Sequence, residues 1–328
     1  MARTKRKKTP VRRKRKKTKR RLLPAPGRII AFLVIAFLLF FSIAAAGYVI
    51  FFRTAVAQEL DSANTIALIF EEPDPPSHSD TVKEIAMDEE GRQSIRRPKV
   101  AVIIDDMGYH HKLGRDLINL PLKLTFSFLP TGPFTAELED LAFQQGRPVL
   151  LHLPMQPKSS QWDPGPGALL VGQAKEDIDT IIDNNLLSVP HASGINNHMG
   201  SRFTSDREGM EKVMEKVGTL GLFFIDSFTS PTSLVEDVAV QYGVPSAKRN
   251  IFLDNVQSAD KVCEQIEKLI RVGEKNGSAI GIGHPNRATL QALSNCSEML
   301  SMRVELVDVK ELVSTGVPGI TPVEQSID

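Results

Sequence analysis

The sequence has few residues of the kinds that mark several common protein classes. Only two cysteines, Cys263 and Cys296, occur among 328 residues, which is too few for a disulfide-dense scaffold. Aromatic residues make up 6% of the chain, with a single Trp. No Gly-rich dinucleotide fingerprint follows the first apolar run after Pro98, and no GxSxG nucleophile elbow occurs. These absences argue against a Rossmann dinucleotide enzyme and an α/β-hydrolase.

Acidic residues are missing from one end of the chain. No Asp or Glu lies between Arg3 and Arg21, where most residues are Lys or Arg, although the formal net charge of the whole chain is only +1. The following segment, Ile29–Phe52, contains no charge and no Pro. As a helix it would span roughly 36 Å at about 1.5 Å per residue, which exceeds a hydrocarbon core of about 30 Å. We therefore predict one transmembrane helix at residues 29–52.

The basic block predicts the orientation of this helix, because Lys and Arg stay on the cytoplasmic side. Residues 1–28 are expected to be a cytoplasmic tail of a single-pass inner-membrane protein, with the rest periplasmic or extracellular. A cleaved signal peptide is an alternative, because Ala55-Val56-Ala57 resembles a cleavage site. However, the apolar region of a signal peptide, about 7–15 residues, is shorter than Ile29–Phe52. Nucleic-acid binding by the tail is another. No aromatic residues are interleaved and no folded module is attached, so we expect no nucleic-acid partner.

The remaining chain divides into a linker, a domain and a short tail. Residues 53–97 are expected to be a linker, since Glu71–Asp80 is polar and rich in Pro. Residues 98–316 alternate short apolar runs with amphipathic stretches, the last of which is Ala288–Met299, and residues 317–328 are a polar tail. The runs are Val100–Ile104, Leu124–Phe128, Val149–Leu153, Gly194–Asn197, Leu222–Ile225, Ile251–Leu253, Ala279–Ile282 and Val304–Val307. This alternation predicts an α/β fold, a (β/α) barrel of seven to eight parallel strands.

Acids and histidines follow several of these runs, at the strand ends where barrels build active sites. These residues are Asp105, Asp106, His152, His198, Asp226 and His284. Each has an ordinary structural interpretation, such as a turn-forming Asp or a buried His bonded to a carbonyl. Asn196 and Asn197 are unusual in an apolar strand and would need partners if buried. His110, His111 and His191 are expected to be solvated or capping residues.

An aspartate and two histidines with open coordination positions are typical of a hydrolytic metal site, with zinc the first choice. Such a metal lowers the pKa of a bound water and polarises a carbonyl. A second carboxylate can then take the proton of the water, and a separate histidine can protonate the leaving group. The pattern therefore predicts a bound divalent cation, with zinc as the first choice.

Five segments carry a resemblance to a known family: IIDDMG, LLHLPMQP, GINNHMGS, FFIDS and GIGHP. Over about Pro98 to Val313 the chain resembles the divergent polysaccharide deacetylases, a remote branch of the metal-dependent polysaccharide deacetylases, which have an irregular (β/α) barrel. The resemblance implies that Asp105 is the catalytic base, that Asp106 is a metal ligand, that His284 is the general acid and that Asp226 is a supporting acid that orients a histidine.

The metal-binding motif of those enzymes, His-x-x-x-His, is altered here. His152 matches its first histidine and is expected to bind the metal, but Gln156 stands at the position of the second. We predict from its placement that His198 supplies the missing nitrogen. The predicted ligands are therefore Asp106, His152 and His198.

Together these features predict a membrane-anchored, metal-dependent deacetylase of N-acetylated cell-envelope polysaccharide, with a glycan substrate and the membrane as partners. The altered motif motivates an alternative, a non-catalytic envelope module that binds glycan or protein. A third interpretation makes the basic tail the functional part and the outer domain a sensor. The sequence leaves open which glycan and which metal are bound, whether Cys263 and Cys296 pair, and the oligomeric state.

Overall fold

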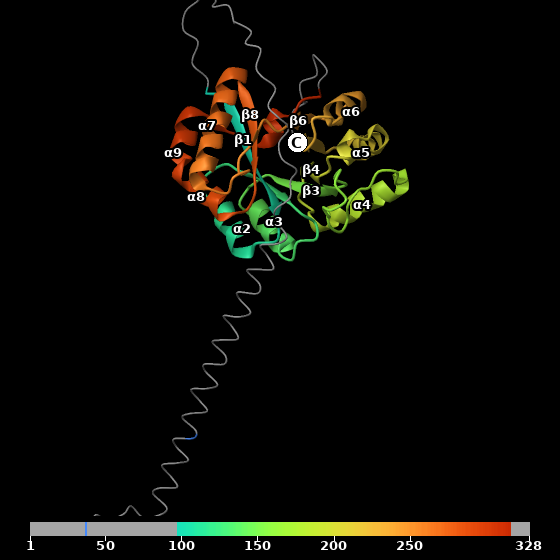
Figure 1. Ribbon diagram of the computed structural model, residues 1–328, viewed down its shortest axis with the longest axis horizontal. Coiled ribbons are helices and arrows are strands. Elements are labelled where there is room, and N and C mark those ends of the chain that lie inside the picture. The colour runs from blue at the N-terminus through green and yellow to red at the C-terminus, as the bar shows by residue number, and fades with distance from the viewer. Residues whose placement is uncertain (1–36, 38–96, 316–328) are drawn as a thin grey trace, which may run out of the picture. The chain divides into compact units, whose positions relative to one another are not determined.

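The computed structural model describes Phe37 and residues 97–315 (Figure 1). The predicted basic tail, the linker and the C-terminal tail lie outside the described residues, as does the predicted transmembrane helix apart from Phe37. Among the described residues, no helix is both long enough and apolar enough to cross a bilayer.

The domain is built on one sheet of nine strands, and all of the paired strands run parallel. In chain order the strands are β1 (Lys99–Met107), β2 (Thr125–Phe128), β3 (Val149–Met155), β4 (Gly194–Met199), β5 (Phe223–Asp226), β6 (Ser246–Lys248), β7 (Ile251–Phe252), β8 (Ser278–Gly283) and β9 (Glu305–Leu306). Their order in the sheet is β6-β5-β4-β3-β2-β1-β8-β7, with β9 paired to β1. All eight predicted runs are strands; β6 is the strand that the sequence did not indicate.

Helices surround the strands (Figure 1). They are α2 (His111–Ile118), α3 (Thr135–Gln144), α4 (Lys175–Ser188), α5 (Arg207–Thr219), α6 (Val235–Tyr242), α7 (Ala259–Asn276), α8 (Arg287–Asn295) and α9 (Ser297–Arg303), with short 3-10 turns η1 (Phe203–Ser205) and η2 (Val309–Leu312). The α5 helix begins where the Asp206 side chain accepts a hydrogen bond from the Gly209 N–H, as an N-cap residue does. The predicted single helix Ala288–Met299 is instead two helices, α8 and α9, which meet at Cys296.

The sheet is buried on both faces, and alternation along β1 shows how. Val100, Val102 and Ile104 belong to the large core beneath the helices. Ala101 and Ile103 point the other way, into a smaller apolar cluster with residues of β3, β5 and β8. Strands buried on both sides need nearly continuous apolar runs, which is the pattern in the sequence.

The sheet is a curled half-barrel rather than a closed barrel, so the predicted barrel is confirmed in part. Its two edge strands, β6 and β7, are separated in the chain only by Arg249 and Asn250. Backbone hydrogen bonds tie this bridge to both edges, from the Arg249 N–H to the Asp226 carbonyl at 3.0 Å and from the Asn250 N–H to the Ile280 carbonyl at 2.8 Å. Two residues can join opposite edges of the strand order only if the sheet curls back on itself.

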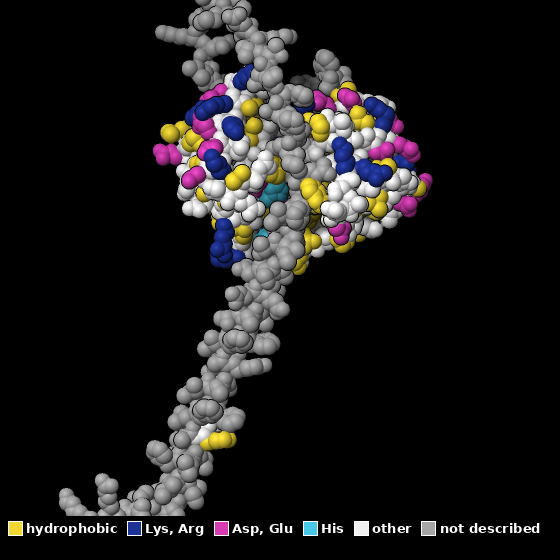
Figure 2. Space-filling view, viewed as in Figure 1, with side chains coloured by type: hydrophobic (Ala, Val, Ile, Leu, Met, Phe, Trp, Pro, Cys, Tyr) yellow, Lys and Arg dark blue, Asp and Glu magenta, His cyan; other side chains and the backbone are white. Residues whose placement is uncertain are grey.

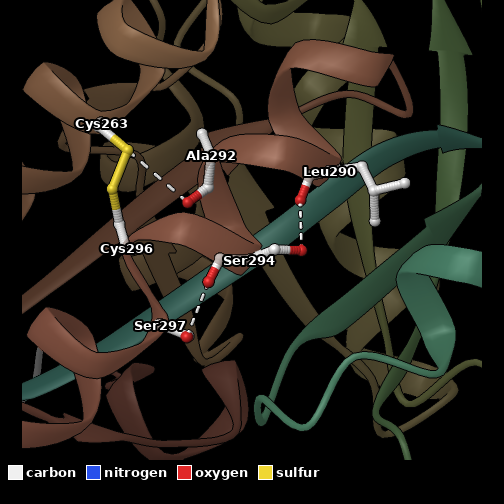
Figure 3. The surroundings of a disulfide bond; sticks show 6 residues. All are labelled: Cys263, Leu290, Ala292, Ser294, Cys296 and Ser297. Carbon is white, nitrogen blue, oxygen red and sulfur yellow. Dashed lines mark hydrogen bonds between the residues drawn. A yellow bond between two sulfur atoms is a disulfide. The ribbon is translucent and has the colours of Figure 1, made fainter.

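Cys263 and Cys296 form a disulfide that links α7 to the junction of α8 and α9 (Figure 3). Their Cα atoms are 6.3 Å apart, within the range that disulfides span. This pairing answers a question that the sequence left open.

Candidate functional site

The pairing of β3 with β4 brings three of the predicted polar residues together. In the parallel register, His152 lies beside Asn196, and Pro154 lies beside His198. Residues two apart in a strand point to the same side, so His198 stands on the same face as Asn196, one step nearer the carboxyl end of the sheet. His198 therefore approaches His152 from the neighbouring strand.

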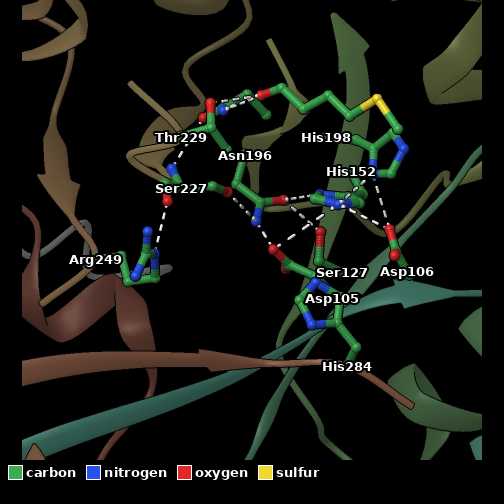
Figure 4. A network of polar contacts seen from close by, with 12 residues as sticks. Asp105, Asp106, Ser127, His152, Asn196, His198, Ser227, Thr229, Arg249 and His284 are labelled. Atoms are coloured by element: carbon green, nitrogen blue, oxygen red, sulfur yellow. Dashed lines mark hydrogen bonds and ion pairs between the residues drawn. The ribbon is translucent and has the colours of Figure 1, made fainter. Parts of the chain in front are cut away.

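The end of β1 adds both carboxylates. Adjacent residues of a regular strand would point in opposite directions, but Asp106 has φ of 52°, in the left-handed region that Asp tolerates better than most residues. The pairing with β2 also shifts register between Ile104 and Met107. As a result, Asp105 and Asp106 both face His152, whose Nε2 is 3.8 Å from Asp105 Oδ2 and 3.2 Å from Asp106 Oδ1 (Figure 4).

Asp106, His152 and His198 could hold a metal ion, since their ligand atoms lie within 4.8 Å of one another. Asp106 Oδ1 is 3.2 Å from His152 Nε2 and 2.9 Å from His198 Nδ1, and the two nitrogens are 3.2 Å apart. A cation about 2.1 Å from each ligand, at angles of 90–109°, would hold the ligands about 3.0–3.4 Å apart. The donor set and its spacing therefore fit a zinc-like cation, and the structure brings together the three predicted ligands.

Asn196 orients His152 for this role. Its Nδ2 donates to Asp105 Oδ1 at 2.8 Å, and a carboxylate only accepts, so the amide oxygen must face the other way, toward His152 and Ser127. That oxygen lies 2.9 Å from His152 Nδ1, which must therefore be the donor, and it also accepts from the Ser127 hydroxyl. The remaining imidazole nitrogen, Nε2, faces the cluster. Outer contacts of this kind commonly set the tautomer of a metal-binding histidine.

The electrostatics of the cluster favour ionised forms. Burial raises the pKa of Asp106, but the His198 charge and hydrogen bonds from His152 and His198 hold that pKa well below its usual value. Burial lowers the pKa of His152, but Asp105 and Asp106 outweigh it and raise the pKa to about 9. A cation that binds here at neutral pH must therefore displace a proton from His152 Nε2.

His284 approaches the cluster from the end of β8, on the side of Asp105 (Figure 4). Its Nδ1 is 3.0 Å from Asp254 Oδ1, and its backbone N–H donates to Asp254 Oδ2 at 2.7 Å. Asn286 and Thr289 donate to the same Oδ2. Burial raises the pKa of Asp254, but His284 and these hydrogen bonds hold it below its usual value. Asp254 thus fixes the orientation of the imidazole through Nδ1.

Asp254 is the acid that the sequence analysis missed, and the predicted supporting acid, Asp226, lies elsewhere. Asp226 Oδ1 accepts the Phe228 N–H at 2.8 Å in the turn after β5. Its catalytic role stays a prediction, but the carboxylate that contacts His284 is that of Asp254. Asp254 follows the run Ile251–Leu253 as Asp226 follows Leu222–Ile225, so the same strand-end signal could have found it.

The Gln156 that replaces a histidine in the motif has a structural role. Its Oε1 accepts the Val171 N–H at 2.9 Å, and its backbone N–H donates to the Leu169 carbonyl. Gln156 therefore anchors the loop that follows β3, while His198 lies where a second imidazole is needed.

Other predicted polar residues also have partners. Asn197 is fully buried, and its side chain donates to the Met199 carbonyl and accepts from the Ser227 N–H. His191 is not merely solvated, because its ring contacts the buried Glu139 at 2.9 Å. His111 contacts Glu137 at the surface, 2.8 Å away.

Comparison with known proteins gives the family. Residues 102–313 match the family model described as divergent polysaccharide deacetylase. The chain is 35% identical over 216 residues to the uncharacterized protein YibQ of Escherichia coli, across 66% of this chain and 67% of YibQ. An uncharacterized Haemophilus influenzae protein is 34% identical over 219 residues, across 67% and 78% of the two chains. The crystal structure of the uncharacterized protein ATU2773 from Agrobacterium tumefaciens superposes with a TM-score of 0.64 at 25% identity, covering 68% of this chain and 92% of that one. The chain belongs to the divergent polysaccharide deacetylase family.

Proposed function

We propose that this protein is a membrane-anchored, metal-dependent deacetylase of N-acetylated cell-envelope polysaccharide. One observation carries the proposal: a carboxylate oxygen and two imidazole nitrogens converge at 2.9–3.2 Å on the carboxyl side of the sheet. The second carboxylate and the His284–Asp254 pair beside them are the further groups that hydrolysis of an amide needs.

The reaction adds water to the acetyl carbonyl carbon and breaks the C–N bond, giving acetate and a free amine. A divalent cation, zinc by the preference of this ligand set, would supply Lewis-acid activation of the water and of the carbonyl. Asp105, which Asn196 orients through a hydrogen bond to Oδ1, accepts the proton of the attacking water. His284 Nε2 delivers a proton to the departing nitrogen, and Asp254 stabilises the imidazolium by accepting from Nδ1.

The proposal also includes the compartment. The basic block before the apolar segment supports a domain outside the cytoplasm. The Cys263–Cys296 disulfide supports it independently, since such bonds form and persist in oxidising compartments. N-acetylated envelope glycans occur in that compartment, so enzyme and substrate would meet there.

The test compares metal content and acetate release for the purified full-length chain and two histidine variants. His198→Ala removes a ligand, so both the bound zinc and the release of acetate from N-acetylglucosamine oligomers should be lost. His111→Ala is the matched control, because it removes a surface histidine that contacts Glu137 outside the cluster, and both readouts should persist.

Two outcomes would contradict the proposal. Unchanged metal content in His198→Ala rejects the ligand set. Zinc-loaded wild-type protein that releases no acetate from any N-acetylated envelope glycan rejects the enzyme and leaves the alternative, a non-catalytic glycan- or protein-binding module. That alternative is motivated by Gln156, which stands where the family's metal-dependent relatives would have a histidine.

A further inference from the structure

A cavity of about 550 Å³ opens directly beside the candidate metal centre, with which it shares His198. This volume falls within the range of about 300–1,000 Å³ that is usual for small-ligand sites. The cavity is lined by Tyr109, Leu129, Thr131, Pro154, Gln161, Trp162, Asp163, Pro164, Gly165, His198 and Met199. On the face shown in Figure 2, histidine side chains reach the surface near the middle of the domain, with hydrophobic side chains close by.

The loop that carries Trp162 is held firmly at its base. Leu169 bridges to the end of β3, where its N–H donates to the Pro154 carbonyl at 2.9 Å. Gly167 has φ of 77°, and its carbonyl accepts from Asn185 Nδ2 on α4. A Cβ at Gly167 would lie 2.5 Å from Asn185 Oδ1, so the close approach requires glycine. The loop therefore presents its side chains in a defined position, as a preformed site does.

The tip of the loop is also ordered by its own contacts. Asp163 Oδ1 accepts a hydrogen bond from the Gly165 backbone N–H at 2.9 Å, and the backbone N–H of Trp162 donates to the Ser159 carbonyl. Trp162 and Tyr109 are both partly exposed at the cavity, and the Tyr109 hydroxyl lies 3.4 Å from Thr131 Oγ1. The wall thus combines two aromatic rings with hydroxyl, amide and carboxylate groups.

This combination suits a sugar ring. The faces of a pyranose present C–H groups, which pack against the electron-rich face of an aromatic ring, while the hydroxyls at its edge need hydrogen-bond partners. The charges of the lining add selectivity. No Lys or Arg is among the described residues that line the cavity, and Asp163 contributes a carboxylate, so a negatively charged sugar would be repelled.

We propose that this cavity is a glycan subsite in which Trp162 packs against a neutral pyranose ring, and that Asp163 disfavours rings bearing a carboxylate. The inference rests on the proposed function, since the position beside His198 is what relates the bound ring to the acetamide under attack. Trp162 and Asp163 are accordingly specificity-determining residues.

The single tryptophan of the chain makes binding directly measurable, because all intrinsic tryptophan fluorescence comes from this site. The full-length chain is titrated with the tetramer of N-acetylglucosamine and with a hyaluronan tetrasaccharide, which alternates N-acetylglucosamine with glucuronate. We expect a saturable fluorescence change with the neutral tetramer and binding at least about tenfold weaker for hyaluronan, equivalent to about 1.4 kcal/mol. Equal binding of the two, or no saturable change with either, would overturn the proposal.

Three variants refine the test, with calorimetry replacing fluorescence. Trp162→Ala should weaken binding of the neutral tetramer about tenfold, and Trp162→Phe should recover most of it, because a flat ring is restored. Asp163→Asn keeps an acceptor for the Gly165 N–H while removing the charge, so it should selectively improve hyaluronan binding. Unchanged affinity in Trp162→Ala, or no gain in Asp163→Asn, contradicts the corresponding assignment.

These readouts separate the subsite from the enzyme. Metal content should equal that of the wild type in all three variants, which excludes collapse of the site as the cause of weaker binding. If the tetramer binds but no acetate is released, the proposed function fails and the subsite stands. If Trp162→Ala releases acetate with unchanged KM, the subsite fails and the proposed function stands.

Discussion

Asp106 and Asp226 have the same sequence signal but different surroundings in the structure. Each follows an apolar strand, and each is almost fully buried, at 4% and 3% exposure. Three histidines, His198 first, bring the pKa of Asp106 well below its usual value despite its burial, whereas burial raises the pKa of Asp226. Two acids with the same signal in the sequence therefore lie in different electrostatic surroundings, which only the contacts of the folded chain reveal.

The surroundings of Asp226 show what such an acid does otherwise. It accepts the N–H of Phe228, a residue held at φ of 51°, which is strained for an aromatic side chain. Arg249, in the bridge between β6 and β7, donates to the carbonyls of Ser227 and Phe228 at 2.7 Å and 3.1 Å. These contacts brace the turn where the sheet curls closed. The comparison thus sets a cluster of an acid and two histidines that could hold a metal ion against a brace of hydrogen bonds around the turn after β5.

The largest expected effect in this comparison is at Asp105. Asp105→Asn keeps the shape of the side chain and an oxygen for Asn196, but it cannot accept the proton of water. Acetate release should fall by about 10²–10⁴-fold, the usual contribution of a general base, while bound metal is retained. Activity equal to that of the wild type would show that Asp105 is not the base.

An intermediate effect, on stability, is expected at Arg249. Arg249→Met keeps much of the packing but leaves the buried Ser227 carbonyl and the partly buried Phe228 carbonyl without their donor, which should lower the free energy of unfolding by about 2–4 kcal/mol. Chemical denaturation measures the loss, and metal content should not change. Arg202→Met, at an exposed arginine, is the control and should be close to neutral. Loss of bound metal in Arg249→Met would show that the metal cluster depends on the contacts of Arg249, and that the two regions are not independent.

The smallest effect should depend on pH. Because burial raises the pKa of Asp226 in the folded state, folding is penalised once the carboxylate must ionise inside the protein. The contribution of Asp226 to stability is therefore greatest below the unfolded pKa of about 3.9 and declines as pH rises through the folded pKa. Asp226→Asn should raise the denaturation midpoint at pH 7–8, and the gain should vanish toward pH 4.

Asp163→Asn, at an exposed residue, serves as a control for this pH experiment, because its denaturation midpoint should equal that of the wild type across the pH range. If the Asp226→Asn variant is less stable than the wild type at neutral pH, the ionised carboxylate must stabilise the fold, for instance through its attraction to Arg249. Loss of acetate release with metal retained would instead support the catalytic role that the sequence predicted for Asp226.

Much of the fold was predictable because it depends on local patterns. Eight apolar runs became eight strands, since burial on both faces requires continuous apolar residues. The missed strand, β6, reads Ser-Ala-Lys and forms because its backbone pairs with β5, not because of its side chains. The split between α8 and α9 at Cys296 was equally invisible, because neither Gly nor Pro marks it.

The sequence by itself determined which residues could do chemistry, because the strand ends carry Asp105, Asp106, His152, His198 and His284. Alternation sets the side on which these residues point except at Asp106, where a left-handed backbone turns the side chain toward His152. Only the tertiary structure decided which acid meets which histidine. Strand order is set by long-range pairing, and it pairs β7, which is followed by Asp254, directly with β8, which is followed by His284, whereas β5 pairs with β4 and β6. For that physical reason Asp254 reaches His284, while Asp226, which has the same local signal, braces the turn beside Arg249.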